Sequence, residues 1–162
     1  MQQITPSLWF DNNAEEAMNY YTEVFKNSKI LRIDRYPEGY TEGPLAGMSG
    51  KVINGEFELN GQRFICLDGG PLFKFNESVS FTIDCADQEE VDYYWERLSA
   101  VPESEQCGWC KDKFGLSWQV VPKQLGELMN DPDKEKSKRV MDAMMQMHKL
   151  VVADLEKAAA GE

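Results

Sequence analysis

Hydrophobic and polar positions alternate with a period of two in several short stretches of this 162-residue chain. Residues 4–10 and 78–83 show this alternation, which is typical of strands. Each stretch is followed by a segment with apolar residues at helical spacing, 14–25 and 88–98. Further β-rich segments lie at 30–36, 51–59, 62–67, 106–111 and 116–121, with room for only a short strand at 101–103. The pattern predicts the element order βαβββ twice.

The two predicted units also share residues at equivalent positions. Tyr20-Tyr21 in the first helical segment aligns with Tyr93-Tyr94 in the second, and Asp11 aligns with Asp84. An internal repeat of this kind indicates a duplicated structural unit. We therefore predict an α+β protein in which two tandem βαβββ modules form a curved mixed sheet around a cavity.

Local signals place the ends of several elements. Asp11 or Asn13 can cap the first helix, and Asp84 or Asp87 can cap the second. Asn60-Gly61 is the favoured pair for a two-residue hairpin turn between strands. Residues 37–50 are rich in glycine and proline and predict a long loop.

The segment beyond Pro122 predicts helices only. A short helix is expected at 125–129, and a longer one is expected to start at Asp131-Pro132-Asp133. Apolar residues recur at helical spacing along the longer helix, at Val140, Met144, Met147, Val151 and Leu155. We expect this stripe to pack on the domain or on a dimer partner. The predicted organisation is a paired domain at 1–122, with modules at about 1–72 and 76–122, and a helical extension at 123–162.

Charge and hydropathy exclude some classes of function. The formal net charge is -11, whereas affinity for nucleic-acid backbones comes mainly from Lys and Arg. No stretch approaches the roughly 20 apolar residues that span a bilayer. The first residues lack the basic and apolar parts of a secretory signal. We expect a cytoplasmic protein that binds neither nucleic acid nor membrane.

The four cysteines are Cys66, Cys85, Cys107 and Cys110, and a cytoplasmic location favours reduced thiols. Cys107 and Cys110 have the spacing of a redox or zinc motif. The surrounding pattern instead predicts a strand, where residues three apart lie roughly 10 Å from each other. A disulfide needs Cα atoms within about 7 Å, and His148 is the only histidine for a zinc site. Neither redox nor zinc chemistry is expected here.

One face of the predicted sheet carries small uncharged polar groups. The paired first strands and the closing strand place hydroxyl, amide and indole side chains on the face that does not pack on the helices. These residues are Thr5, Ser7, Trp9, Ser78, Ser80, Thr82, Ser117 and Gln119. A polar face can simply be exposed to solvent. The absence of Lys and Glu favours a ligand pocket with a few orienting groups.

Several longer motifs carry a family resemblance. They are residues 4–11, Ala14-Glu15-Glu16-Ala17, Asp68-Gly69-Gly70-Pro71 and residues 107–109 with 112–122. With the duplicated βαβββ order, they resemble the vicinal-oxygen-chelate superfamily, which includes glyoxalase I, extradiol dioxygenases and bleomycin-resistance proteins. Within it the chain is similar to a 3-demethylubiquinone-9 3-methyltransferase-like group. The likeness is expected to cover nearly the whole chain, including the Met-rich tail.

The resemblance implies a homodimer with a cavity that holds a divalent ion in metal-dependent relatives. Those ligand positions fall near Thr5, Cys66 or a neighbour, Ser78 and Gln119, and none is a histidine or a carboxylate. Neutral hydroxyl and amide groups bind transition metals weakly. We predict neither a metal nor another cofactor. The methyltransferase activity in the group's label would need a site for the methyl donor, and no glycine-rich turn joins a predicted strand to a helix. Methyl transfer in ubiquinone biosynthesis is kept as a further alternative function.

Three functions follow from these patterns. The first is a metal-free protein that binds a small organic molecule through Thr5, Ser7, Trp9, Cys66, Ser78, Ser80, Thr82, Ser117 and Gln119. The second is an enzyme of the same superfamily, with Cys107, Asp112 and the loop acids Glu38 and Glu42 as candidate acid–base groups. A turn-stabilising role is the competing interpretation for Asp112. The third is a structural or partner-binding role for the C-terminal helix.

Overall fold

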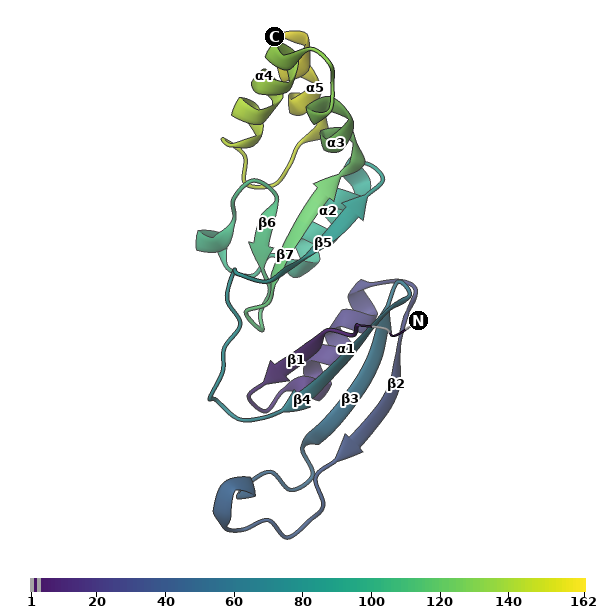
Figure 1. Ribbon diagram of the computed structural model, residues 1–162, viewed down its shortest axis with the longest axis vertical. Helices are drawn as coiled ribbons and strands as arrows, with labels where there is room; N and C mark the ends of the chain where they lie inside the picture. Colours follow the sequence, from purple (N-terminus) through teal and green to yellow (C-terminus); the bar gives the residue numbers. More distant parts are fainter. Residues whose placement is uncertain (1, 3) are drawn as a thin grey trace. The chain divides into compact units, whose positions relative to one another are not determined.

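A computed structural model describes residue 2 and residues 4–162 of the chain. The chain divides into two compact units, Met1–Lys74 (unit 1) and Phe75–Glu162 (unit 2). Each unit contains a mixed sheet, and unit 2 also carries the C-terminal helices (Figure 1). This confirms the α+β class. Within the described residues, no helix combines the length and apolar character needed to cross a bilayer.

Unit 1 has the complete βαβββ order that the sequence predicts. Its elements are β1 (Ser7–Phe10), α1 (Ala14–Val24), β2 (Ser28–Arg35), β3 (Val52–Leu59) and β4 (Gln62–Asp68). The sheet order is β1-β4-β3-β2, with β1 parallel to β4 and the other pairs antiparallel. Asn60 and Gly61 join β3 to β4 with φ angles of 48° and 85°, which confirms the predicted hairpin turn.

The loop predicted at 37–50 is present between β2 and β3. It contains a single short 3-10 turn, η1 (Gly43–Leu45). Backbone hydrogen bonds from Tyr36 N to Lys51 O (2.9 Å) and from Gly50 N to Tyr36 O (3.0 Å) close its base. Met48 is the buried hydrophobic residue of the loop, so a thioether anchors an otherwise exposed segment.

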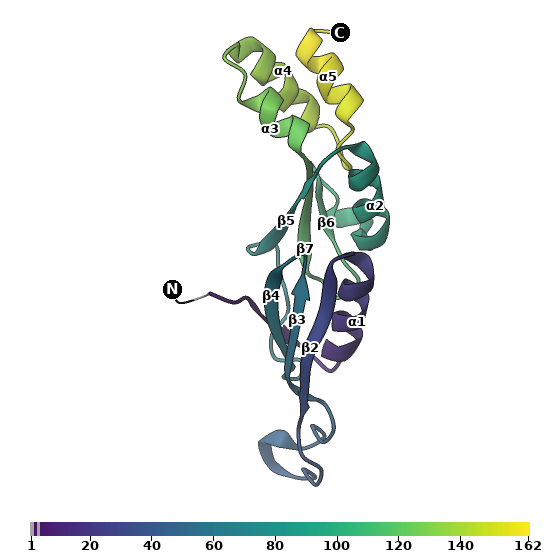
Figure 2. The same cartoon turned by 90° about the vertical axis from the view of Figure 1, so that its right-hand side faces the viewer.

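Helix α1 packs against one face of the sheet of unit 1 (Figure 2). The rings of Tyr21 and Phe57 stack with centroids 6.2 Å apart, and Phe57 stacks on Phe64 at 5.3 Å. The apolar stripe of α1 is therefore buried against β3 and β4, as its helical spacing predicts.

The cap predicted for α1 is wrong. Asn13 occupies the N-cap position, but its side chain makes no capping hydrogen bond. The N–H of Ala14 instead donates to Oδ1 of Asp68, at the end of β4, over 2.9 Å. Because Asp68 lies far away in the sequence, a local pattern could not identify it. In α2 (Gln88–Leu98) the local prediction holds, since Asp87 accepts from Glu90 N at 3.0 Å.

Unit 2 repeats this arrangement with one strand fewer. Its elements up to the end of the sheet are β5 (Ser80–Cys85), α2, the 3-10 turn η2 (Pro102–Ser104), β6 (Trp109–Lys111) and β7 (Ser117–Pro122). The sheet order is β5-β7-β6, with β5 parallel to β7. The short strand predicted near residue 101 is wrong, because the segment with Pro102 forms η2. The predicted strand at 106–111 is shorter and begins at Trp109.

Three helices follow β7: α3 (Lys123–Met129), α4 (Lys134–Met144) and α5 (Val152–Ala160). The prediction of one long helix after residue 131 is wrong, because residues 145–151 separate α4 from α5. The apolar stripe still forms one cluster, since the chain reverses there. Its buried members are Val140, Leu155 and Ala159, with Leu125, Leu128, Met129, Met144 and Met147 packed around them. The C-terminal helices thus bury their apolar faces against one another.

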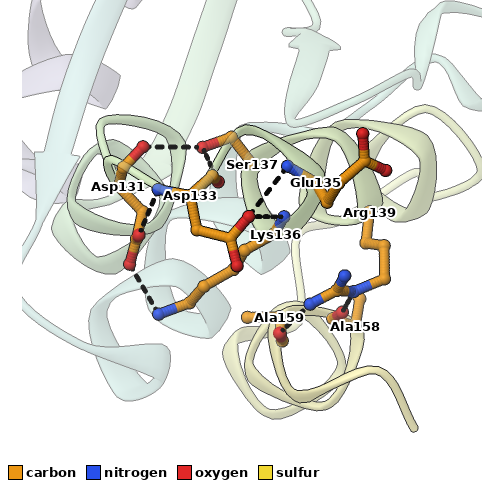
Figure 3. A network of polar contacts seen from close by, with 8 residues as sticks. All are labelled: Asp131, Asp133, Glu135, Lys136, Ser137, Arg139, Ala158 and Ala159. Atoms are coloured by element: carbon orange, nitrogen blue, oxygen red, sulfur yellow. Dashed lines mark hydrogen bonds and ion pairs between the residues drawn. The ribbon is translucent and has the colours of Figure 1, made fainter.

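Polar contacts stabilise the ends of these helices (Figure 3). Asp133 caps α4 by accepting from Glu135 N at 3.0 Å and from Lys136 N at 3.3 Å. The Arg139 guanidinium donates to the last carbonyls of α5, those of Ala158 (3.0 Å) and Ala159 (2.7 Å). A cation at a helix C-terminus is favourable because the dipole is negative there. Arg139 therefore joins α4 to the end of α5.

Candidate functional site

A row of three side chains crosses the sheet of unit 2 on the face opposite α2. In the strand register Gln119 of β7 lies between Thr82 of β5 and Trp109 of β6. Directly paired residues share a face of the sheet. The alternate residues Trp118 and Val120 are buried. The row therefore presents a hydroxyl, an amide and an indole together.

This row forms the floor of a hollow of about 640 Å³. The hollow is lined by five side chains that carry a polar atom or a thiol and by four apolar side chains from β7, α3 and the end of α4. The lining residues are Thr82, Gln106, Cys107, Trp109, Gln119, Val121, Leu125, Met144 and Met145. We call this the unit 2 hollow. Its volume lies in the range of small-molecule sites, and its lining contains no charged side chain.

The amide of Gln119 is held in a defined orientation. Its Nε2 donates to Ser80 Oγ over 2.9 Å, so a residue of the predicted polar face supports another that lines the hollow. Ser117, two residues before Gln119, is buried, and within the described chain its Oγ has no hydrogen-bond partner. Ser78 is exposed and its Oγ donates to Asn76 Oδ1 over 2.5 Å. The three serines thus have different environments.

Cys107 lies in a turn and not in the predicted strand. Cys107 and Gly108 have φ angles of 51° and 85°, and Gln106 and Trp109 exchange two backbone hydrogen bonds across them, at 3.1 and 2.8 Å. This is the two-residue hairpin geometry that needs positive φ at both central residues. The strand prediction failed because alternation does not detect a turn of this type. The turn places Cys107 at the hollow.

The four thiols fall into two classes. All are free, and Cys66, Cys85 and Cys110 are buried whereas Cys107 is partly exposed. Burial is the main cause that raises the pKa of each buried thiol to about 12. Because the thiolate is the reactive form, these three thiols are inert near neutral pH. Cys107 is the accessible thiol among them.

Asp112 is a buried acceptor in the turn between β6 and β7. Its Oδ1 accepts from Phe114 N (2.8 Å) and Leu116 N (3.0 Å), and its Oδ2 accepts from Trp118 Nε1 (2.8 Å). Asp112 does not line the unit 2 hollow. The contacts support the turn-stabilising interpretation of this residue. The other candidate acids, Glu38 and Glu42, are exposed in the loop of unit 1.

The candidate face of unit 1 is organised around Trp9. Its Nε1 donates to Gly70 O over 2.9 Å, and its ring meets that of Phe73 edge to face at 5.0 Å. A Cβ at Gly69 would lie 2.2 Å from the indole, so the glycine permits this packing. Ser7 is exposed and Thr5 is half-buried.

Cys66 lies on the other face of the same sheet. It pairs with Leu8, whereas Trp9 pairs with Leu67. A Cβ at Gly55 would touch both Cys66 Sγ and Met18 of α1, which shows that the thiol packs toward the helix. Cys66 is therefore separated from Ser7 and Trp9. A hollow shared by Thr5, Ser78 and Gln119 remains a prediction.

The donor set does not fit the divalent-metal site that the resemblance implies. Thr5, Ser78 and Gln119 offer neutral oxygens, and Cys66 offers a buried thiol that retains its proton. Such groups lack the charge or imidazole nitrogen that holds a divalent ion. Among the residues that the structure describes, no cluster of three His, Cys, Asp or Glu side chains could hold a metal.

Sequence reasoning identified part of the unit 2 hollow. Thr82, Gln119 and Cys107 were candidates. The other polar lining residues, Gln106 and Trp109, were not, and neither were Leu125, Met144 and Met145, which form the wall of the hollow. The register of β6 against β7 could have indicated Trp109. Met144 was assigned to a packing stripe. No sequence pattern indicates that Met145 lines the hollow, because its position depends on where the chain turns after α4.

A protein-family model matches most of the chain. The model of the 3-demethylubiquinone-9 3-methyltransferase family matches residues 2–121. It ends before α3, so the expected extension of the likeness into the Met-rich tail is wrong. No curated protein matches the chain.

Solved structures resemble the chain over the same proportion of its length. A Bacillus cereus protein, provisionally named a 3-demethylubiquinone-9 3-methyltransferase and PhnB protein, is 39% identical with a TM-score of 0.62. The match covers 75% of this chain and 99% of that one. Protein PA1353 of Pseudomonas aeruginosa is 18% identical with a TM-score of 0.59, and the match covers 75% of this chain and 98% of that one. A Staphylococcus aureus protein is 30% identical with a TM-score of 0.34, and the match covers 74% of this chain and 95% of that one.

Proposed function

Because the chain belongs to the 3-demethylubiquinone-9 3-methyltransferase family, we propose that it is a metal-free protein that binds a small organic molecule in the unit 2 hollow. The observation that carries this proposal is the row Thr82–Gln119–Trp109 on the floor of an uncharged hollow. We propose further that the protein acts as a homodimer in the cytoplasm.

The lining defines the class of ligand. Trp109, Val121 and Leu125 offer apolar surface, and Met144 and Met145 add polarizable thioethers that favour aromatic partners. Thr82 and Gln119 offer a hydroxyl and an amide for orientation. Transfer of a charged group into this lining would leave it without a countercharge. The ligand is therefore an uncharged, mainly aromatic molecule with one or two hydrogen-bonding groups.

The activity in the family's name has no counterpart in the described elements. Helices α1 and α2 follow Asn13 and Asp87, and α3 follows Pro122, so none begins at a glycine-rich turn. Gly69-Gly70 follows β4 and leads into residues 71–79, which form no helix. These observations favour binding over methyl transfer.

The alternative is an enzyme of the same superfamily that uses Cys107. One observation favours it, since this accessible thiol lines the hollow beside the polar row. Pretreatment with iodoacetamide separates the two functions. Alkylation of Cys107 would abolish turnover of a substrate, whereas simple binding would be weakened only by the added bulk.

Binding is tested with a panel of uncharged aromatic amides and phenols, by ligand-detected NMR followed by calorimetry. Thr82→Val and Gln119→Leu keep the side-chain volume and remove the polar groups. Each is expected to weaken binding by about 1 kcal/mol or more, roughly fivefold or more. Thr41→Val, which makes the same change as Thr82→Val at an exposed threonine in the loop of unit 1, is the matched control. Equal affinities for all four proteins would reject this hollow as the site.

A further inference from the structure

Two sulfur atoms meet at the unit 2 hollow although their residues lie far apart in the chain. Cys107 Sγ of the turn before β6 is 3.7 Å from Met145 Sδ, which follows α4. Met144 also lines this hollow, so a second thioether is available there. Thiolate and thioether sulfurs are soft ligands, and they select soft ions such as Cu(I) over Mg²⁺, Ca²⁺ or Mn²⁺.

The separation of the sulfurs suits a shared ion. Metal–sulfur bonds of about 2.3 Å at tetrahedral to trigonal angles place two sulfur ligands about 3.8–4.0 Å apart. The observed 3.7 Å requires a movement of only a few tenths of an ångström. Met145 is half-exposed and Cys107 partly exposed, so an ion can reach both atoms from solvent.

Hydrogen bonds hold both residues in place. Gln106 Nε2 donates to Cys107 Sγ (3.1 Å) and to Met145 O (2.9 Å), and so connects the two donors through one amide. Cys107 N donates to Met147 O, and Gly108 N to His148 O, both over 2.8 Å. Ligands fixed by supporting contacts lose little freedom on binding. The amide can keep its hydrogen bond to the sulfur after deprotonation, because a thiolate is the better acceptor.

We propose that Cys107 and Met145, with Met144 as a further sulfur donor, bind one soft monovalent ion of the Cu(I) or Ag(I) type. On binding, the Cys107 S–H bond breaks, its proton passes to solvent and the sulfur donates an electron pair to the ion. No oxidation or reduction accompanies the step. The site lies in the same hollow as the proposed organic ligand but does not require that ligand, and it contains no residue of the divalent set that the family resemblance implies.

Ag(I) titration with native mass spectrometry and calorimetry tests this site. The wild-type protein is expected to bind one Ag(I) per chain with release of one proton. Gln106→Leu should weaken binding about 10-fold through lost support, and Cys107→Ser and Met145→Leu should weaken it about 100-fold or more. Met141→Leu alters an exposed methionine of α4 that does not line the hollow, and should match the wild type.

The outcomes separate this proposal from the proposed organic ligand. Thr82→Val should leave Ag(I) binding unchanged and weaken the organic molecule. Wild-type affinity in Met145→Leu, or stoichiometric Ag(I) on Cys107→Ser, would overturn the soft-metal site. Near-ultraviolet circular dichroism verifies that each variant is folded. Ag(I) bound only as the protein unfolds would come from the buried thiols and would also overturn it.

Discussion

Asp68 Oδ1 accepts the backbone N–H of Ala14 over 2.9 Å, and so caps α1 from the end of β4. Its Oδ2 accepts from Val52 N at 3.0 Å, at the start of β3. The carboxylate is buried. One side chain therefore satisfies the first turn of the helix and the first residue of a strand, and connects three elements of unit 1.

Asp68→Asn is expected to destabilise the protein by about 1–3 kcal/mol. The amide can serve only one of the two N–H groups, since its NH₂ would face the other as a second donor and leave it unsatisfied. Urea unfolding measures the loss. Asp11→Asn, at an exposed position before α1, is the control. A variant at Asp68 as stable as this control would show that the two hydrogen bonds are energetically unimportant.

Glycine substitutions give effects of opposite sign in the two units. Gly69→Ala would place a Cβ 2.2 Å from the Trp9 ring, so the indole must move, at a cost of about 1–3 kcal/mol. Gly126 lies inside α3, and a Cβ there meets nothing within 4 Å. Gly126→Ala should therefore stabilise the protein by about 0.5–1 kcal/mol, because alanine favours helix. Thermal unfolding distinguishes these signs, and a stabilising Gly69→Ala would contradict the packing of Trp9.

Thiol reactivity should separate Cys107 from the other cysteines. In the native protein near pH 8, Ellman's reagent is expected to modify one thiol per chain quickly. Burial keeps Cys66, Cys85 and Cys110 protonated, with pKa values raised to about 12, so they react only after unfolding. Cys107→Ser should remove the fast phase and leave the slow one. A fast phase of two or more thiols would show that the buried set is accessible.

The same three thiols predict a loss of stability in alkali. Their pKa values rise from an ordinary value of 9.0 to about 12 on folding, so the unfolded state loses protons first. Their contribution is complete below pH 9.0 and decreases as the pH rises toward 12. Urea midpoints between pH 8 and 10.5 measure the decrease. Cys85→Ala should flatten this slope, and a slope that Cys85→Ala leaves unchanged would contradict the effect of burial.

The sequence predicts repeated local features better than features that depend on distant segments. Alternation and helical spacing located β1, α1, β4, β5 and α2, and the Asn60-Gly61 turn was correct because its geometry depends on those two residues. The cap by Asp68 was missed because this residue lies far from α1 in the sequence. The turn at Cys107 was missed because it requires a positive φ at a non-glycine residue. The break between α4 and α5 was missed because an apolar stripe continues across it.

The candidate site shows the same division. Thr82 and Gln119 follow from strand alternation, and the structure places both in the unit 2 hollow. Cys66 has the expected strand but the opposite face, because a shift of one residue changes the side of the sheet. The wall of Leu125, Met144 and Met145 depends on how α3 and α4 fold back onto the sheet of unit 2. Both helices lie outside the residues that the family model matches, and hydrophobic periodicity does not predict how helices fold back.

The final prediction concerns this wall. Leu155 is fully buried in the cluster that joins α4 and α5, so Leu155→Ala should cost about 2–5 kcal/mol in the stability of these helices. The packing of α4 on α5 is expected to hold residues 145–151 in place. When this packing opens, the amides of Cys107 and Gly108 lose their acceptors, Met147 O and His148 O. Hydrogen exchange should then accelerate at 107–108 and leave β3 unaffected. Glu156→Ala, at an exposed neighbouring position, is the matched control. In Leu155→Ala, the amides of residues 107–108 could stay protected while α5 exchanges freely. This outcome would mean that the turn keeps its structure at the hollow without the C-terminal helices.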